Sequence, residues 1–310
     1  MHDDEHSCES SGATLLTRFI WALILNAGLA IGEIVMSLIT GSTALLADGL
    51  NNLDVTAALL LSIYSERAAK RPADRRHTFG HQRMDVLAGF AKGCFLLFAA
   101  VLIVYKAAYF LMEPVEIPGV AVLITASVAL VVNLASAFWL KEDACHSLNA
   151  KGTYLCMVYD AVGSVAVMIS SVAMLLWGFV YFDVVASAVI VFFMTKSGLS
   201  LLRESIAIFM QTAPEGFDYD EFESTVKAIP NVTAIGDIHV WSHSPNEHHL
   251  TCRVAVEITE SCDCDRIVKA VEDLCRTRFN IQHSTVQLVY NPSEVAPDCG
   301  APGNPSTEVA

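Results

Sequence analysis

The sequence predicts an α-helical membrane protein with six transmembrane helices, followed by a small α+β domain. The chain has 310 residues, of which 54% are hydrophobic and only 17% are charged. Most apolar residues precede residue 210, in runs long enough to cross a bilayer as helices. After that point the hydropathy falls and short amphipathic patterns begin. We therefore expect a membrane domain over residues 14–208 and a soluble domain over residues 209–291.

Six apolar segments are the expected spans, and each should be helical because lipid offers backbone groups no hydrogen bonds. They cover residues 15–39, 43–66, 84–112, 117–140, 150–178 and 181–203. Residues 1–13 form an acidic tail with His and Cys, which makes a cleaved signal peptide a poor interpretation. Lys and Arg gather in the loops after the second and fourth spans, as in cytoplasmic loops. Both termini should then be cytoplasmic, and the compact chain suggests a bacterial inner membrane.

The soluble segment shows five short elements in the order α-β-β-α-β. They cover residues 217–229, 236–243, 249–259, 264–279 and 284–290. This order suits a ferredoxin-like α+β domain with its helices on one face of the sheet. Residues 292–310 are rich in Pro, Gly and Ser, and we expect them to be disordered.

Composition excludes several classes of function. The net charge of −14 argues against nucleic acid as a partner. The chain has no glycine-rich nucleotide loop, P-loop or hydrolase nucleophile elbow, so we expect neither an enzyme nor an ATP-driven pump. The nine cysteines fall mostly in cytoplasmic or intramembrane positions, where thiols stay reduced. They therefore favour metal ligation or packing over a disulfide framework.

Two acidic residues lie inside the apolar spans, where a carboxylate costs several kcal/mol. Asp54 follows Asn51 by three residues, and Asp160 follows Cys156 by four. Both spacings place the pair on one helix face. Two such faces supply four O, N or S ligands, the number that a tetrahedral divalent metal takes. The sequence therefore predicts a membrane protein that moves a metal ion.

Six segments, taken in order, resemble the cation diffusion facilitator family of proton-coupled divalent metal exporters. They are GEIVMSLITGSTALLADGLNN, PADRRHTFGHQRMDVLAG, GTYLCMVYDAVGSV, LLRES, IHVWS and HSTVQL, and the likeness extends over roughly residues 14–291. The resemblance implies six transmembrane helices, a cytoplasmic metal-binding domain and a homodimer. It also implies export of a divalent ion against inward proton flow, by alternating access.

In that family the second and fifth helices each present two ligands four residues apart, ending in Asp. Cys156 and Asp160 match this pattern, and Cys in place of the common His favours zinc or cadmium. The second helix departs from it, because the residue four before Asp54 is Leu50, which cannot bind a metal. Asn51 is the best substitute.

Asp48 and Asn52 are also four residues apart and face a neighbouring side of the second helix. Asp48 is therefore a further candidate ligand. An oxygen-rich second helix suits manganese or iron about as well as zinc, whereas Cys156 favours softer ions. Zinc is the first expectation for substrate and regulatory ligand, with Cd²⁺, Co²⁺, Ni²⁺, Fe²⁺ and Mn²⁺ left open.

The resemblance implies a second metal site in the loop after the second span, where Asp74, His77 and His81 are closely spaced. Alternatively, the two histidines cap the next helix or contact lipid headgroups. Glu33 and Asp183 match two further family acids. Glu33 could help to form a cation or proton path, and Asp183 could be a favourable charge at a helix N-terminus.

A third site is implied in the soluble domain, where His239, Cys252 and His283 match positions that often carry His ligands near the dimer interface. Metal binding there would be regulatory. Other candidates could add to a soluble site or serve as ordinary polar residues; they are His243, His248, His249, Cys262 and Cys264.

Alternatives to the zinc- or cadmium-type exporter are an exporter of manganese or iron, a membrane-anchored metal sensor without transport, and a passive channel. A mere anchor has no use for Asp54 and Asp160 inside the membrane. A channel has no use for Cys156 and Asp160 as tight ligands.

Overall fold

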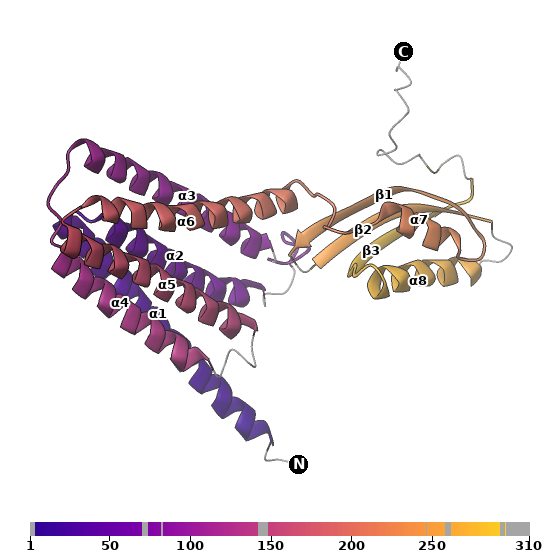
Figure 1. Ribbon diagram of the computed structural model, residues 1–310. Helices are drawn as coiled ribbons and strands as arrows, with labels where there is room; N and C mark the ends of the chain where they lie inside the picture. Colours follow the sequence, from indigo (N-terminus) through magenta and orange to yellow (C-terminus); the bar gives the residue numbers. More distant parts are fainter. Residues whose placement is uncertain are drawn as a thin grey trace. The chain divides into compact units, whose positions relative to one another are not determined.

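The computed structural model describes residues 4–69, 74–81, 83–141, 148–245, 247–257, 262–291 and 295. The chain forms two compact units that divide close to residue 203. The first holds the long helices α1–α6, and the second holds a small sheet with helices α7 and α8 (Figure 1). The tail expected over residues 292–310 lies outside the described residues, apart from residue 295.

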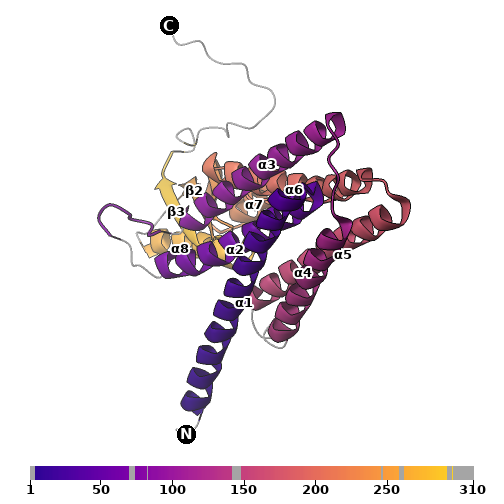
Figure 2. The same cartoon turned by 90° about the vertical axis from the view of Figure 1, so that its left-hand side faces the viewer.

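The first unit contains the six long helices that the hydropathy predicted. They are α1 (Asp4–Thr40), α2 (Thr43–Ala69), α3 (Arg83–Met112), α4 (Gly119–Leu140), α5 (Leu148–Trp177) and α6 (Tyr181–Phe209). In the described residues, all but α2 contain a stretch long and apolar enough to cross a membrane. Helix α1 begins inside the segment expected to be a tail, and it extends beyond its neighbours at its N-terminal end (Figure 2).

The bundle has the polarity of a membrane protein, with apolar side chains outside and polar ones inside. Trp21, Val101 and Phe138 are 54%, 67% and 75% exposed. The buried positions along α1 instead recur every three or four residues and include polar side chains: Ala22, Asn26, Ala30, Glu33 and Ser37. Such a stripe turns one face of the helix towards the bundle interior.

Helix α2 packs against α1, α3 and α5. Two glycines permit this close approach. A Cβ atom on Gly49 of α2 would lie 3.0 Å from the Cβ of Glu33, and one on Gly163 of α5 would lie 2.8 Å from Asp48 Oδ1. The small residues therefore let the acids of α1 and α2 reach the bundle interior.

Asp183, at the start of α6, caps the N-terminus of α2. Its carboxylate accepts hydrogen bonds from the backbone N–H groups of Thr43, at 2.5 Å, and Ala44, at 3.1 Å. The hydroxyls of Ser42 and Thr43 donate to it at 2.5 and 2.7 Å. These bonds satisfy N–H groups that a helix leaves open at its start. Asp183 was expected to be a favourable charge at the N-terminus of its own helix. It does lie in the first turn of α6, and it also caps the N-terminus of α2.

The second unit has the expected order of elements: α7 (Tyr219–Lys227), β1 (Val232–Ser244), β2 (Glu247–Val256), α8 (Cys262–Thr277) and β3 (His283–Val289). The sheet order is β1-β2-β3, with β1 and β2 antiparallel and β2 and β3 parallel. Phe222 of α7 and Val271 of α8 share one buried core with strand residues such as Leu250 and Val254. Both helices therefore cover the same face of the sheet, as predicted.

Candidate metal site

The four expected membrane ligands come together inside the bundle, from α2 and α5. Asp54 and Asp160 are 5% and 1% exposed, and Asn51 and Cys156 are half-buried. The Asn51 amide donates a hydrogen bond of 2.7 Å to Asp160 Oδ1. Cys156 interacts electrostatically with both Asp54 and Asp160. The two spacings in the sequence therefore converge on one place.

A fifth side chain, Lys92 of α3, reaches the same place and was not singled out from the sequence. Its ammonium group lies 3.3 Å from Asp54 Oδ2, with side-chain exposures of 25% for Lys92 and 7% for Asp54. Cys156 and Asp160 also lie within range of its charge. An ionisable residue within an apolar span is unusual whatever its sign. Applied to bases as well as acids, that criterion would have found Lys92.

Each of the two central carboxylates uses one oxygen and keeps the other open. Among the described residues, Asp54 Oδ1 and Asp160 Oδ2 are buried and have no hydrogen-bond partner. In the same part of the chain, no three His, Cys, Asp or Glu side chains are placed closely enough to hold a metal ion. The donors are thus neighbours, but Asn51 and Lys92 now bind the carboxylates that a metal would need.

Asp48 belongs to a polar network next to these residues. It is fully buried and accepts a 3.0 Å hydrogen bond from the hydroxyl of Ser164. Glu33, also fully buried, accepts one of 2.6 Å from the amide of Asn52. The two carboxyl groups of Glu33 and Asp48 also contact each other. Asp48 and Asn52 therefore share a side of α2, which faces Glu33 of α1.

The loop before α3 brings Asp74, His77 and His81 together. Asp74 Oδ1 accepts hydrogen bonds from the backbone N–H groups of Arg76, at 2.7 Å, and His77, at 2.6 Å. The backbone bond from His77 is the main reason that the pKa of Asp74 falls to about 2. The rings of His77 and His81 have centroids 4.3 Å apart. The carboxylate orders the turn and at the same time lies beside two possible metal ligands.

The three ligands expected in the second unit, His239, Cys252 and His283, do not come together within one protomer. Cys252 is 3% exposed in the apolar core, and its register partner on β3 is Val286. Burial raises its pKa to about 12. His283 pairs in register with His249, which lies three strand positions, an odd number, from Cys252. Neighbouring strand positions point to opposite faces, so Cys252 and His283 face away from each other.

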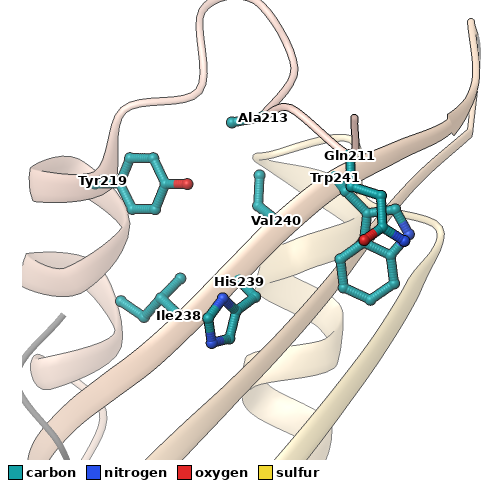
Figure 3. A pocket seen from close by; sticks show the side chains of 7 residues that line it. All are labelled: Gln211, Ala213, Tyr219, Ile238, His239, Val240 and Trp241. Atoms are coloured by element: carbon teal, nitrogen blue, oxygen red, sulfur yellow. The ribbon is translucent and has the colours of Figure 1, made fainter. Parts of the chain in front are cut away.

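His239 pairs in register with Thr251, so it shares the sheet face of His283 and faces away from Cys252. Its Nε2 atom is 2.9 Å from Asp237 Oδ1, and its side chain is 58% exposed. Together with Tyr219 and Trp241 it lines a pocket of about 340 Å³ (Figure 3). His239 is the one metal-ligating side chain in that lining, so the pocket offers no donor set.

The structure gathers a different set of histidines on the sheet. The ring centroid of His249 lies 5.1 Å from that of His243 and 5.1 Å from that of His283. His248 points elsewhere and contacts the hydroxyl of Ser242 at 3.1 Å. Cys264 lies 3.9 Å from the hydroxyl of Tyr290, and the side chain of Cys262 is outside the described part.

Two sequence-family models match the chain. The cation efflux transmembrane domain matches residues 19–210, and the cation efflux protein cytoplasmic domain matches residues 214–289. The boundary between the two matches falls just after the end of α6.

Three curated relatives resemble the chain over nearly its whole length. The "Metal cation efflux system protein CzcD" of Cupriavidus metallidurans is 29% identical, covering 89% of this chain and 87% of its own. The "Zinc transporter ZitB" of Escherichia coli is 28% identical, covering 96% and 94%. The "Cadmium, cobalt and zinc/H(+)-K(+) antiporter" of Bacillus subtilis is 27% identical, covering 86% of each chain.

Proposed function

The chain belongs to the cation diffusion facilitator family, and we propose that Asn51, Asp54, Cys156 and Asp160 form its transport site. It is an integral membrane protein of a transporter family and not an enzyme. The relatives named for zinc, cadmium and cobalt support efflux of zinc- and cadmium-type divalent ions. They give no support to a manganese or iron exporter, or to a sensor without transport.

The observation that carries the proposed site is the contact between Asn51 and Asp160, which joins α2 to α5 beside Asp54 and Cys156. Carboxylate, amide and thiolate groups together suit a borderline or soft divalent ion. The buried, open oxygens of Asp54 and Asp160 are the donors such an ion would take. Asp48 and Glu33 add negative charge from the adjoining network.

We further propose that protons drive the export. Carboxyl and thiol groups must lose their protons to bind a metal, so proton and metal compete for one site. A site that opens by turns to each side of the membrane exchanges one for the other. The Bacillus subtilis relative is named as an antiporter that uses both protons and potassium, so a potassium gradient belongs in the test.

The soluble unit supports two further proposals. The match to a cytoplasmic domain of cation efflux proteins favours a homodimer. It also favours a cytoplasmic location for this unit and for both termini. The membrane is then the inner membrane of a bacterium. For regulatory metal binding, the neighbouring rings of His243, His249 and His283 are better candidates than a set that includes Cys252, and the three would have to move closer to hold an ion. The loop around His77 and His81 is proposed as a secondary site on the same side.

The test is metal flux into proteoliposomes with an imposed pH gradient, with and without a potassium gradient, for zinc, cadmium, cobalt, nickel, iron and manganese. The parent should move zinc and cadmium, and Cys156→His should change the preference between them. Cys94→Ser is the matched control, because Cys94 lies exposed on α3. Flux that ignores Cys156 would contradict the site, and flux without a pH dependence would contradict proton exchange.

A further inference from the structure

We propose that Lys92 is a built-in competitor of the metal ion, holding the place beside Asp54 until a divalent ion displaces it. The inference rests on the proposed transport site between α2 and α5. It adds a residue of α3 that sets how tightly the site holds its substrate.

The contact is a direct one to a proposed ligand. Lys92 Nζ lies 3.3 Å from Asp54 Oδ2, and Asp54 is almost fully buried. Lys92 also lies within range of Asp160 and Cys156, the proposed ligands from α5. The ammonium group therefore sits where a cation would sit, and its charge has the same sign.

The helix that carries Lys92 is held firmly at the adjacent residue. A Cβ atom on Gly93 would lie 2.9 Å from Leu202 Cγ and 3.1 Å from the carbonyl oxygen of Gly198, both on α6. Helix α3 thus packs closely on α6 at this level, which fixes the origin of the Lys92 side chain. The flexible four-carbon stem of lysine can still carry the charge away from Asp54.

Like charges decide the consequence. An ammonium group and a divalent ion repel strongly at this range, because the bundle interior screens charges far less than water does. Metal binding must therefore displace Lys92, which weakens the affinity of the site. When the ion leaves, Lys92 returns and neutralises Asp54, which favours release.

A second lysine of α3 is held in the bundle without a hydrogen bond to any carboxylate that the structure describes. Lys106 donates to the hydroxyl of Ser37 at 3.1 Å and to the carbonyl oxygens of Ser37 and Ser42 at 3.4 Å. At the helical rise it lies about 21 Å along α3 from Lys92. It is therefore a matched control for removal of a half-buried lysine charge.

The experiment is a cadmium titration of the full-length protein in detergent. The signal is the thiolate-to-cadmium absorbance that Cys156→Ser abolishes, so that binding to the soluble unit is excluded. Lys92→Met keeps the length of the stem without its charge, Lys92→Gln is a second neutral variant, and Lys92→Arg keeps the charge. Size-exclusion profiles identify any variant that has lost its fold.

We expect Lys92→Met and Lys92→Gln to bind cadmium at least about tenfold more tightly than the parent. Lys92→Arg should bind no more tightly than the parent, and Lys106→Met should match it. A purely structural ion pair would predict the reverse, with weaker binding once Lys92 is neutral.

Unchanged or weaker binding in the folded neutral variants would overturn the inference. So would the absence of a Cys156-dependent signal in the parent and neutral variants alike. The titration needs no flux, so a failure of proton-coupled export, seen in vesicles, is distinguishable from a failure of this inference.

Discussion

Cys156 in the membrane bundle and Cys252 in the soluble unit suggested the same role from the sequence, yet the two units surround them in opposite ways. Cys156 is half-buried beside Asp54, Asp160 and Lys92, in a bundle that turns its polar groups inward. Cys252 lies in an apolar core that turns its histidines to the other face of the sheet.

The difference bears on which of the two cysteines is suited to bind a metal. The thiolate is the form that binds, and an apolar core disfavours it. Burial raises the pKa of Cys252 to about 12, which makes its thiolate costly, and its neighbours are those of a packing residue. Cys156 has the mixed, charged surroundings in which a metal can replace a proton.

The strongest way to break this comparison is Asp160→Asn. If the bundle holds the transport site, zinc flux in proteoliposomes should fall to the level of empty vesicles, because a proposed ligand and its charge are lost. The soluble unit should stay folded, as judged by hydrogen exchange over residues 217–289. Asp237→Asn, which alters a carboxylate of the sheet, should leave flux close to that of the parent.

Removing each thiol in turn sharpens the comparison. Cys156→Ala should lower cadmium flux by at least about tenfold with little loss of stability. Cys252→Ala should do the opposite, leaving flux unchanged and lowering the stability of the soluble unit by about 1–2 kcal/mol through the cavity it creates. Flux assays and hydrogen exchange on the same full-length preparations measure both. Equal effects of the two substitutions on flux would contradict the assignment.

Alkaline pH should affect the soluble unit through its buried thiols. Burial raises the pKa of Cys252 to about 12 and that of Cys275 to about 11, above the ordinary value of 9. Unfolding would release these protons once the pH exceeds 9, so stability is retained below that value and lost as the pH rises towards 12. We expect a loss of up to about 5 kcal/mol between pH 8 and 11, roughly half from each thiol. Hydrogen exchange of β2 should show it, and Cys252→Ala should reduce it.

The smallest expected effect concerns Asp74 in the loop before α3. Its pKa of about 2 means that it stays ionised from pH 7 down to pH 5. The turn that it holds should weaken only as the pH falls from about 4 towards 2, because the lowered pKa stabilises the ionised form. A carbon-13 titration of the Asp74 carboxyl group would measure this. A midpoint near the ordinary value would show that the bond from His77 is not formed.

Hydropathy and period were enough to predict most of the fold. The apolar runs located α1–α6 to within a few residues, with two exceptions: an acidic segment with no apolar signal is helical at the N-terminus of α1, and α6 continues six residues beyond its expected end, to Phe209. The strand period also indicated that Cys252 is a core residue, whereas the family resemblance had suggested a metal ligand. Cys252 lies two residues from both Leu250 and Val254, so the strand period alone places all three side chains on the core face.

Other features depend on contacts between distant segments, which no local pattern contains. Helical spacing pairs Cys156 with Asp160, but not Lys92 with Asp54 on another helix. The contact of Glu33 with Asp48 likewise requires Gly49 and Gly163 to bring three helices together. Sequence reasoning identified which side chains could act, whereas packing decided which of them meet.

The cap that Asp183 places on α2 has a consequence for how the protein is made. The carboxylate that completes the start of α2 comes from a residue 140 positions later in the chain. During synthesis, α2 leaves the ribosome well before α6 exists. Its first N–H groups therefore lack the Asp183 carboxylate until the last helix of the bundle is made. Within a membrane such groups find few other partners. The arrival of α6 therefore completes the cap of α2, and a chain that ends before Asp183 lacks these bonds between the second and sixth helices.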